Sequence, residues 1–190
     1  MRRLVVSMNI TLNGFMAGPN GELDWHEPYW DEEMGTIITQ QLGDADTLLI
    51  GRNTYECMAP YWQAQHSDIS APRETMDFAD MMNRYEKVIF SKTLKSVSWH
   101  NARLAKRPLG KEIKALKASQ GKDMMVYGSG ELVTQLIRLN LVDKYLIWIY
   151  PVAIKTGRPL FKSRLNIVPY KTKAFKNGVV LMYCKTKMSS

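Results

Sequence analysis

The order of the predicted secondary structure is the feature that most constrains how this chain folds. Short β-prone runs alternate with amphipathic helical patterns along most of the sequence, and such alternation is typical of a parallel sheet whose crossover connections are helices. The predicted strands are residues 4–10, 47–51, 87–91, 97–99, 124–127 and 145–150, and the predicted helices are residues 31–42, 53–62, 72–85, 108–119 and 131–139.

The end of the chain departs from this alternation. Two β-prone runs, residues 167–175 and 179–184, lie on either side of Asn177-Gly178, the dipeptide that most often forms a two-residue hairpin turn. The predicted fold is therefore α/β, a three-layer αβα arrangement in which helices cover both faces of a mostly parallel sheet and a C-terminal antiparallel hairpin lies at one edge. No repeat or Gly/Ser-rich linker divides the sequence, so we expect one domain spanning residues 1–190.

Several classes of protein are excluded by what the sequence lacks. There is no run of about 18 uncharged apolar residues, and the apolar stretch after Met1 is too short for a signal peptide, so we expect a cytoplasmic protein with no membrane partner. Two cysteines and three widely separated histidines provide neither a disulfide framework nor the ligand spacing of a metal centre. We therefore expect no bound metal.

The net charge of +8 conceals two halves of opposite sign. Residues 1–86 contain 5 Lys and Arg against 14 Asp and Glu, a net charge of −9, whereas residues 87–190 contain 21 against 4, a net charge of +17. A basic half of this size is typical of proteins that bind nucleic acid, acidic lipid or a phosphorylated small molecule, although it can also be only a solvated surface. Because its lysines are scattered and no zinc-finger, RNP or G-x-x-G motif accompanies them, the sequence argues against a nucleic-acid partner.

Three of the predicted strands are followed by segments suited to binding phosphate. These segments combine glycines, hydroxyls and cations, and they are Gly51-Arg52-Asn53-Thr54, Ser91-Lys92-Thr93 and Gly128-Ser129-Gly130-Glu131. Each segment alone could be a tight turn or a solvated charge. In a parallel sheet, however, the carboxyl ends of the strands lie along one edge, so the three segments together predict a single site for an anionic nucleotide.

A family resemblance includes the first of these segments and runs along nearly the whole chain. Residues 51–56, Gly-Arg-Asn-Thr-Tyr-Glu, resemble the G-R-x-T-[WY]-E segment of dihydrofolate reductases. Residues 11–18 resemble the S-L-D-G-x-I-A loop of the C-terminal reductase domain of bifunctional riboflavin-biosynthesis proteins, and residues 141–144, 150–152 and 157–161 are similar to that family's late segments L-V-D-E, P-V and G-x-P-L-F. The chain is therefore identified as a small stand-alone member of the dihydrofolate reductase-like superfamily, most similar to these riboflavin reductase domains.

The resemblance implies an oxidoreductase that uses NADPH and transfers a hydride to a planar N-heterocycle, a pteridine or an aminouracil-like substrate. An arginine suits such a site because its planar fork donates two parallel hydrogen bonds to a phosphate. By position, the resemblance implies that Gly51, Arg52 and Thr54 contact cofactor phosphates, Ser91 and Lys92 the adenosine 2′-phosphate, Gly128, Ser129, Gly130 and Glu131 the diphosphate, and backbone groups of Asn9, Met16 and Ala17 the nicotinamide carboxamide.

The resemblance also indicates where a proton donor would lie. Reduction of a C=N bond is easier when the nitrogen is protonated, which in dihydrofolate reductases depends on a carboxylate near the helix after the first loop. Asp24 and Asp31 occupy that region and are the candidate catalytic residues, although Asp31, at a predicted helix start, could instead be an N-cap. Trp25 and Trp30 lie beside them and could stack on a flat substrate or simply belong to the core.

Departures from the family pattern leave the reaction open. Asn13 stands where the S-L-D-G loop has aspartate, and Lys155 stands where the late segment usually has the first glycine of G-x-G, so the resemblance alone does not assign the riboflavin-pathway substrate to this chain. The alternative is a non-catalytic nucleotide-binding protein that retains the reductase fold. The apolar late strands, residues 146–150 and 179–183, need cover on both faces and, together with the resemblance, predict a homodimer.

Overall fold

The computed structural model describes residues 1–65 and 73–186, with residues 73–76 described by their backbone alone. Its helices are the 3₁₀ helix η1 (Asp24–Tyr29), α1 (Glu32–Gly43), α2 (Arg52–Gln65), α3 (Arg73–Arg84), α4 (Leu109–Ala118) and α5 (Gly130–Arg138). Its strands are β1 (Leu4–Thr11), β2 (Phe15–Ala17), β3 (Ala45–Gly51), β4 (Glu86–Phe90), β5 (Ala102–Leu104), β6 (Asp123–Tyr127), β7 (Lys144–Tyr150), β8 (Arg158–Pro159), β9 (Ile167–Ala174) and β10 (Val180–Thr186).

Eight of these strands form one sheet in the order β5-β4-β3-β6-β1-β7-β10-β9, while β2 and β8 form a separate two-stranded sheet. The six strands from β5 to β7 pair in parallel, whereas β10 is antiparallel to both of its neighbours, β7 and β9. This order confirms the predicted mostly parallel sheet with an antiparallel hairpin at one edge. It also brings the carboxyl ends of β1, β3, β4, β6 and β7 to the same edge of the sheet, which we call the carboxyl edge.

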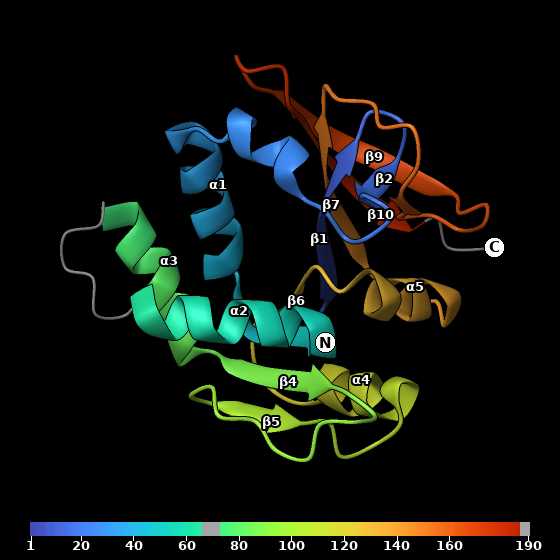
Figure 1. Cartoon of the computed structure of the whole chain (residues 1–190). Helices are drawn as coiled ribbons and strands as arrows, with labels where there is room; N and C mark the ends of the chain where they lie inside the picture. Colours follow the sequence, from blue (N-terminus) through green and yellow to red (C-terminus); the bar gives the residue numbers. More distant parts are fainter. Residues whose placement is uncertain (66–72, 187–190) are drawn as a thin grey trace.

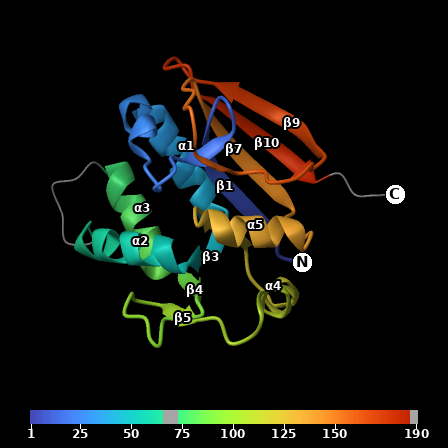
Figure 2. The ribbon, with the colours of Figure 1, turned by 45° about the vertical axis from the view of Figure 1, so that its right-hand side comes forward.

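Helices cover both faces of the sheet, as Figures 1 and 2 show: α1, α2 and α3 lie on one face, and α4 and α5 lie on the other. The first face is filled by residues such as Met34 of α1 and Tyr55 of α2, and the second by residues such as Ile113 of α4. The apolar residues of α5 recur at helical spacing on its inner side, at Leu132, Val133 and Leu136. The predicted three-layer αβα fold is therefore confirmed.

One predicted strand is wrong. Residues 97–99 are irregular, and the strand that pairs with β4 is β5, three residues further along the chain. The apolar character of the predicted segment comes from Trp99, whose buried indole donates a hydrogen bond to the Asn83 side chain, while the backbone N–H of Ser98 donates to the Tyr55 hydroxyl. The segment thus anchors the loop on α2 and α3 instead of pairing with a strand. The predicted start of the third long helix, at Pro72, lies outside the described residues.

The hairpin predicted from Asn177-Gly178 is confirmed. Gly178 has a φ of +89°, which suits glycine, and its N–H donates to the carbonyl of Phe175. The Asn177 side chain reaches away from the hairpin and donates to the carboxylate of Asp31 at the start of α1. The tip of the hairpin is therefore tied to the segment that carries the candidate acids.

No helix among the described residues combines the length and the apolar character needed to cross a lipid bilayer.

Candidate functional site

The segments that follow β3 and β6 touch each other at the carboxyl edge. A Cβ atom placed on Gly51 would lie 1.8 Å from Oγ of Ser129, and one placed on Gly128 would lie 3.6 Å from Oγ1 of Thr54. Only glycine at position 51 permits so close an approach. Two of the three predicted phosphate-binding segments therefore form one continuous surface of backbone and hydroxyl groups.

The turn from β6 into α5 has a backbone arranged for an anion. Gly128 and Ser129 have φ values of +74° and +61°, and Ser129 occupies the N-cap of α5 without making a side-chain cap. The first backbone N–H groups of α5 are thus left uncapped by that side chain, and together with the positive end of the helix dipole they suit a diphosphate. The Sδ–Cε end of Met16 lies over this turn, because a Cβ on Gly130 would be 2.1 Å from its Cε atom.

The third predicted segment lies beside the first. Phe90, the last residue of β4, pairs with Gly51, so Ser91 and Lys92 follow directly next to Gly51-Arg52. The Ser91 hydroxyl oxygen accepts hydrogen bonds from the backbone N–H groups of Thr93 and Leu94, which folds this segment into a turn, and Lys92 is exposed. The sheet therefore brings all three predicted segments to one edge.

Arg52 is the first residue of α2, and its guanidinium lies 3.5 Å from the Glu56 carboxylate. Both side chains are about half exposed, so the pair contributes little to stability. A phosphate could therefore replace Glu56 as the partner of Arg52 at small cost. The neighbouring Glu131, in the first turn of α5, is also exposed and could offer its backbone N–H.

The loop after β1 is held down by residues that depart from the family pattern. The Thr11 hydroxyl donates to Oδ1 of Asn13, and the Asn13 amide in turn donates to the carbonyl of Ile154 at 2.8 Å. These contacts place β2 against β8, where a Cβ on Gly157 would lie 2.4 Å from the carbonyl oxygen of Ala17. Met16 and Ala17 are buried as a result, whereas Asn9, in β1, is half-buried at the carboxyl edge.

The two predicted substrate-binding tryptophans have different environments. Trp25, in η1, is buried and packs edge-on against the rings of Tyr150 and His26, at centroid distances of 5.3 and 5.5 Å. Trp30 is 60% exposed and contacts Gly35 in the first turn of α1. The structure therefore places Trp25 in the core below the carboxyl edge and Trp30 on the surface.

The two candidate acids also differ. Asp31 is the N-cap of α1: its Oδ1 accepts from the Met34 N–H and its Oδ2 accepts from the Asn177 amide, both at 2.8 Å. Asp24 is exposed at the start of η1, and no side chain among the described residues is hydrogen-bonded to it. Asp31 therefore performs the capping role that the sequence left open, and Asp24 is the acid with unengaged oxygens.

Burial shifts the titration of two rings near these acids. It lowers the pKa of His26, which keeps that imidazole neutral at pH 7, and it raises the pKa of Tyr150 to about 12, with the Asp31 carboxylate adding to the rise. Burial therefore favours the neutral form of both rings.

Sequence reasoning missed Tyr127, the last residue of β6, which directly precedes Gly128-Ser129-Gly130. Its hydroxyl is buried and has no hydrogen-bond partner among residues 1–65 and 77–186, and burial raises the pKa of the phenol far above its usual value. The available signal was its position, because residues at the carboxyl ends of parallel strands line the ligand crevice.

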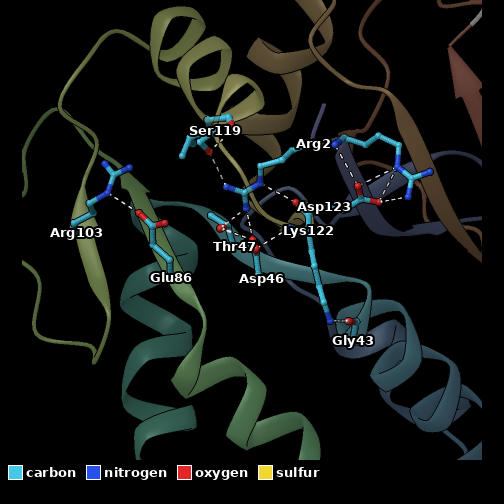
Figure 3. Close-up of polar contacts among 11 residues, drawn as sticks. Arg2, Gly43, Asp46, Thr47, Glu86, Arg103, Ser119, Lys122 and Asp123 are labelled. Carbon is cyan, nitrogen blue, oxygen red and sulfur yellow. Dashed lines mark hydrogen bonds and ion pairs between the residues drawn. The ribbon is translucent and has the colours of Figure 1, made fainter.

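A groove of about 830 Å³ lies at the opposite end of the strands, which we call the amino edge. Figure 3 shows the polar network there: the Arg2 guanidinium is paired with Asp46 and also donates to Thr47, Ser119 and the carbonyl of Lys122. Arg3 is paired with Asp123, and Lys117 with Asp143. Since these cations are paired with carboxylates of the protein itself, we assign the groove a structural role and do not treat it as the candidate site.

Comparison with known proteins gives a family match over most of the chain. Residues 2–181 match the model of the RibD C-terminal domain family. The chain is 32% identical over 182 residues to the uncharacterized protein YyaP of Bacillus subtilis, covering 94% of this chain and 92% of YyaP.

Solved structures share the fold at low sequence identity. Acinetobacter baumannii RibD superposes with a TM-score of 0.71 at 13% identity, over 99% of this chain and 59% of that one. Dihydrofolate reductase from Enterococcus faecalis, solved in complex with NADP(H), superposes with a TM-score of 0.60 at 13% identity, over 98% of this chain and 97% of that one. Likeness at this level of identity shows a dihydrofolate reductase-like fold.

Proposed function

The chain belongs to the RibD C-terminal domain family, and from this premise we propose that it is an NADPH-dependent oxidoreductase acting on a planar N-heterocycle of the pteridine or aminouracil kind. The family supports a reductase-type activity. The observation that carries the proposal is the contact between the segments after β3 and β6, where Gly51 lies against Ser129 and Gly128 lies against Thr54. A Cβ atom at position 51 would fill the space between these two segments. Because residue 51 is glycine, the residues present fit a bound dinucleotide.

Bound NADPH supplies the hydride, and the protein's task is to hold the cofactor and the substrate in register. In this proposal, the uncapped first turn of α5 receives the diphosphate, through backbone N–H groups of Gly130 and Glu131. The side chains of Arg52, Ser91 and Lys92 receive the 2′-phosphate, and Thr54 contacts the adjoining phosphates. Met16, Ala17 and Asn9 hold the carboxamide end of the nicotinamide.

The proposed proton donor is Asp24. Its carboxylate is exposed and unengaged among the described residues, whereas both oxygens of Asp31 accept hydrogen bonds that hold α1 and the hairpin in place. The same observation favours the second candidate, a non-catalytic nucleotide-binding protein, because neither carboxylate is both buried and unengaged. Consumption of NADPH in the presence of pterins or aminouracils distinguishes an enzyme from such a binding protein.

We expect the cofactor preference to depend on Arg52. Charge-assisted hydrogen bonds to a phosphate contribute roughly 1.5–3 kcal/mol each, whereas the hydroxyl of NADH is a neutral partner. Arg52→Ala should therefore weaken NADPH binding about tenfold or more and change NADH binding much less, as measured by fluorescence titration. Glu56→Gln is the matched control, since it removes the partner of Arg52 and should leave NADPH binding equal or tighter.

Three results would count against this assignment. Equal binding of both cofactors, or an equal loss for both on Arg52→Ala, would remove Arg52 from the 2′-phosphate. Binding of neither cofactor would contradict the proposed function as a whole.

We also propose that the protein is a homodimer. The edge strand β9 is uncovered in the single chain, and its Val168 and Tyr170 are each 48% exposed, which is unusual for large apolar side chains on an edge strand. Sedimentation at micromolar concentration should show a species of twice 21.8 kDa. A single species near the mass of one chain would contradict the proposal.

A further inference from the structure

Two buried polar side chains in the described part of the molecule have no hydrogen-bond partner at all. They are Trp25, through its indole N–H, and Tyr127, through its hydroxyl. Two other buried atoms are also unpartnered, but they belong to Gln41 and Glu112, whose other polar atoms are engaged by Tyr183 and Arg103. A buried donor without a partner is costly, and native proteins rarely retain one without a reason.

The two unpartnered donors lie over the same face of the sheet, on either side of β1. Tyr127 of β6 pairs with Ser7 of β1, and Tyr150 of β7 pairs with Thr11 of β1. Residues paired across parallel strands share a face, and Ser7 and Thr11 share one because they are four positions apart. Tyr150 is the ring on which Trp25 packs, so this face carries Tyr127 on one side of β1 and Trp25 on the other.

Asn9 lies on the same face between these two donors, because it is two positions from both Ser7 and Thr11. It is half-buried, and its position near the carboxyl end of β1 places it at the edge where the cofactor is proposed to bind. Helices α1, α2 and α3 cover this face, and Phe78 of α3 packs against the Tyr127 ring at a centroid distance of 6.2 Å. Tyr127 directly precedes Gly128-Ser129-Gly130 and Trp25 directly follows Asp24, so both donors belong to segments to which the proposed function assigns the cofactor and the substrate.

We infer that Tyr127 Oη and Trp25 Nε1 are hydrogen-bond donors to acceptor atoms of the bound heterocycle, an inference that rests on the proposed function. An indole N–H can only donate, and the raised pKa of the Tyr127 phenol keeps its proton in place. The ligand must therefore present an acceptor to each group, such as a ring carbonyl oxygen or an unprotonated ring nitrogen. Pteridines and uracils offer such acceptors on more than one edge.

This role changes how Trp25 is understood. Its ring packs at nearly a right angle against the rings of Tyr150 and His26, and its N–H is the polar group that it can contribute to a ligand. A purely aromatic ligand of the same size would leave both donors unpaired. The site therefore selects for acceptor-bearing rings, because binding the wrong ring retains the cost of two buried, unsatisfied groups.

Tyr127→Phe provides a test, with Tyr145→Phe as the matched control. Tyr145 is a buried tyrosine on the opposite face, and its hydroxyl lies near Thr186, whose own hydroxyl donates to the carbonyl of Val142. Melting of the ligand-free protein should show Tyr127→Phe at or above the wild-type Tm, because an unpaired hydroxyl is removed, whereas Tyr145→Phe should melt about 2–4 °C lower. Calorimetric titration of pterin and of 5-aminouracil into the NADP⁺-saturated protein should then show binding about fivefold to tenfold weaker for Tyr127→Phe and unchanged for Tyr145→Phe.

The outcomes separate this inference from the proposed function. If Tyr127→Phe lowers the Tm as much as Tyr145→Phe does, the hydroxyl is a structural group and the inference is overturned. The inference is also overturned if Tyr127→Phe binds either probe as tightly as the wild type does. It is likewise overturned if the wild type binds NADPH but its NADP⁺-saturated form binds neither probe. If the wild type does not bind NADPH, the proposed function is contradicted instead.

Discussion

The two ends of the parallel strands differ in how completely their buried polar groups are hydrogen-bonded. At the amino edge, the Arg2 guanidinium is almost fully buried, yet it is satisfied by Asp46, Thr47, Ser119 and a backbone carbonyl. At the carboxyl edge, the N-terminus of α5 has no side-chain cap, and the donors of Trp25 and Tyr127 have no partner within the described part of the chain. The same sheet thus has one saturated and one unsaturated end.

We interpret this difference as a division of roles, in which the amino edge contributes to stability and the carboxyl edge has the binding role proposed above. A buried charge is tolerated only when its partners are complete, so the amino edge contributes to folding and has nothing left to offer a ligand. Donors that are left unpaired lower stability and become useful only when a ligand supplies acceptors. The comparison predicts that mutations at the amino edge change unfolding, whereas mutations at the carboxyl edge change binding.

The largest effect is expected for Arg2→Ala at the amino edge. The substitution removes a buried guanidinium with its hydrogen bonds to Asp46, Thr47, Ser119 and the Lys122 carbonyl, and we expect a loss of about 3 kcal/mol in the free energy of unfolding, measured by urea denaturation. NADPH affinity, measured below the transition, should not change. A loss smaller than about 1 kcal/mol would show that the amino edge is not the saturated, stabilising end described above.

A second effect concerns Lys87, which is buried near the start of β4. Its ammonium donates to the carbonyls of Met82, Asn83 and Tyr85 at the end of α3, while burial lowers its pKa from 10.5 to about 8. Between these two pH values the unfolded chain binds more protons than the folded one, so this residue makes the free energy of unfolding rise with pH.

The rise from pH 8 to pH 10 should be up to about 2 kcal/mol in the wild type and absent from Lys87→Met, when the two proteins are compared at each pH by urea denaturation. The difference between the proteins isolates Lys87 from tyrosines that titrate in the same range. Parallel pH profiles would indicate that the three carbonyls hold the proton on Lys87 throughout.

At the carboxyl edge, Gly51→Ala should act chiefly on binding. The new Cβ would lie 1.8 Å from Oγ and 2.7 Å from Cβ of Ser129, so the turn into α5 must move. We expect the affinities for NADPH and NADH to fall together by about tenfold, or ~1.4 kcal/mol, because the shared diphosphate cradle is displaced. Gly43→Ala, where nothing lies within 4 Å of the added atom, is the control and should bind both as wild type does.

The smallest effect is expected at Asp31, where stability and chemistry can be separated. Asp31→Ala removes the N-cap of α1 and should cost about 1 kcal/mol of unfolding free energy, whereas Asp31→Asn keeps an oxygen acceptor and should cost much less. If Asp24 is the proton donor, Asp31→Asn should retain NADPH turnover and Asp24→Asn should lose it. The reverse result would return the acid role to Asp31.

The layers and the sheet type could be predicted from the sequence because they depend on local pattern. Strand–helix alternation, the apolar spacing of α5 and the Asn177-Gly178 turn are each legible within a few residues. The wrong prediction of a strand at residues 97–99 has a tertiary cause. Trp99 packs beside Lys87 and donates a hydrogen bond to Asn83, and these contacts with distant residues account for the apolar side chain there. A short window cannot distinguish such an anchor from a strand.

The site was predictable only in part, for a related reason. Glycines, hydroxyls and cations after the strands indicated which segments meet, and the contacts of Gly51 and Gly128 confirm that two of them do. The state of each side chain was not predictable, because hydrogen bonding to distant residues decides it. Asp31 is occupied by Asn177, which lies 146 positions away, whereas Asp24 in the same segment is free of such a partner among the described residues.

The sequence by itself determined the α/β architecture, the family and the segments that line the carboxyl edge, because these depend on periodicity and on residue types at strand ends. Only the tertiary structure decided which polar groups are satisfied. Burial and hydrogen bonding are set by neighbours from other elements, so Arg2 is saturated by residues up to 120 positions away, whereas Tyr127 and Trp25 meet no partner among the described residues. That distribution of unpaired donors, together with the motifs, is the basis of the ligand-binding role that we propose for the carboxyl edge.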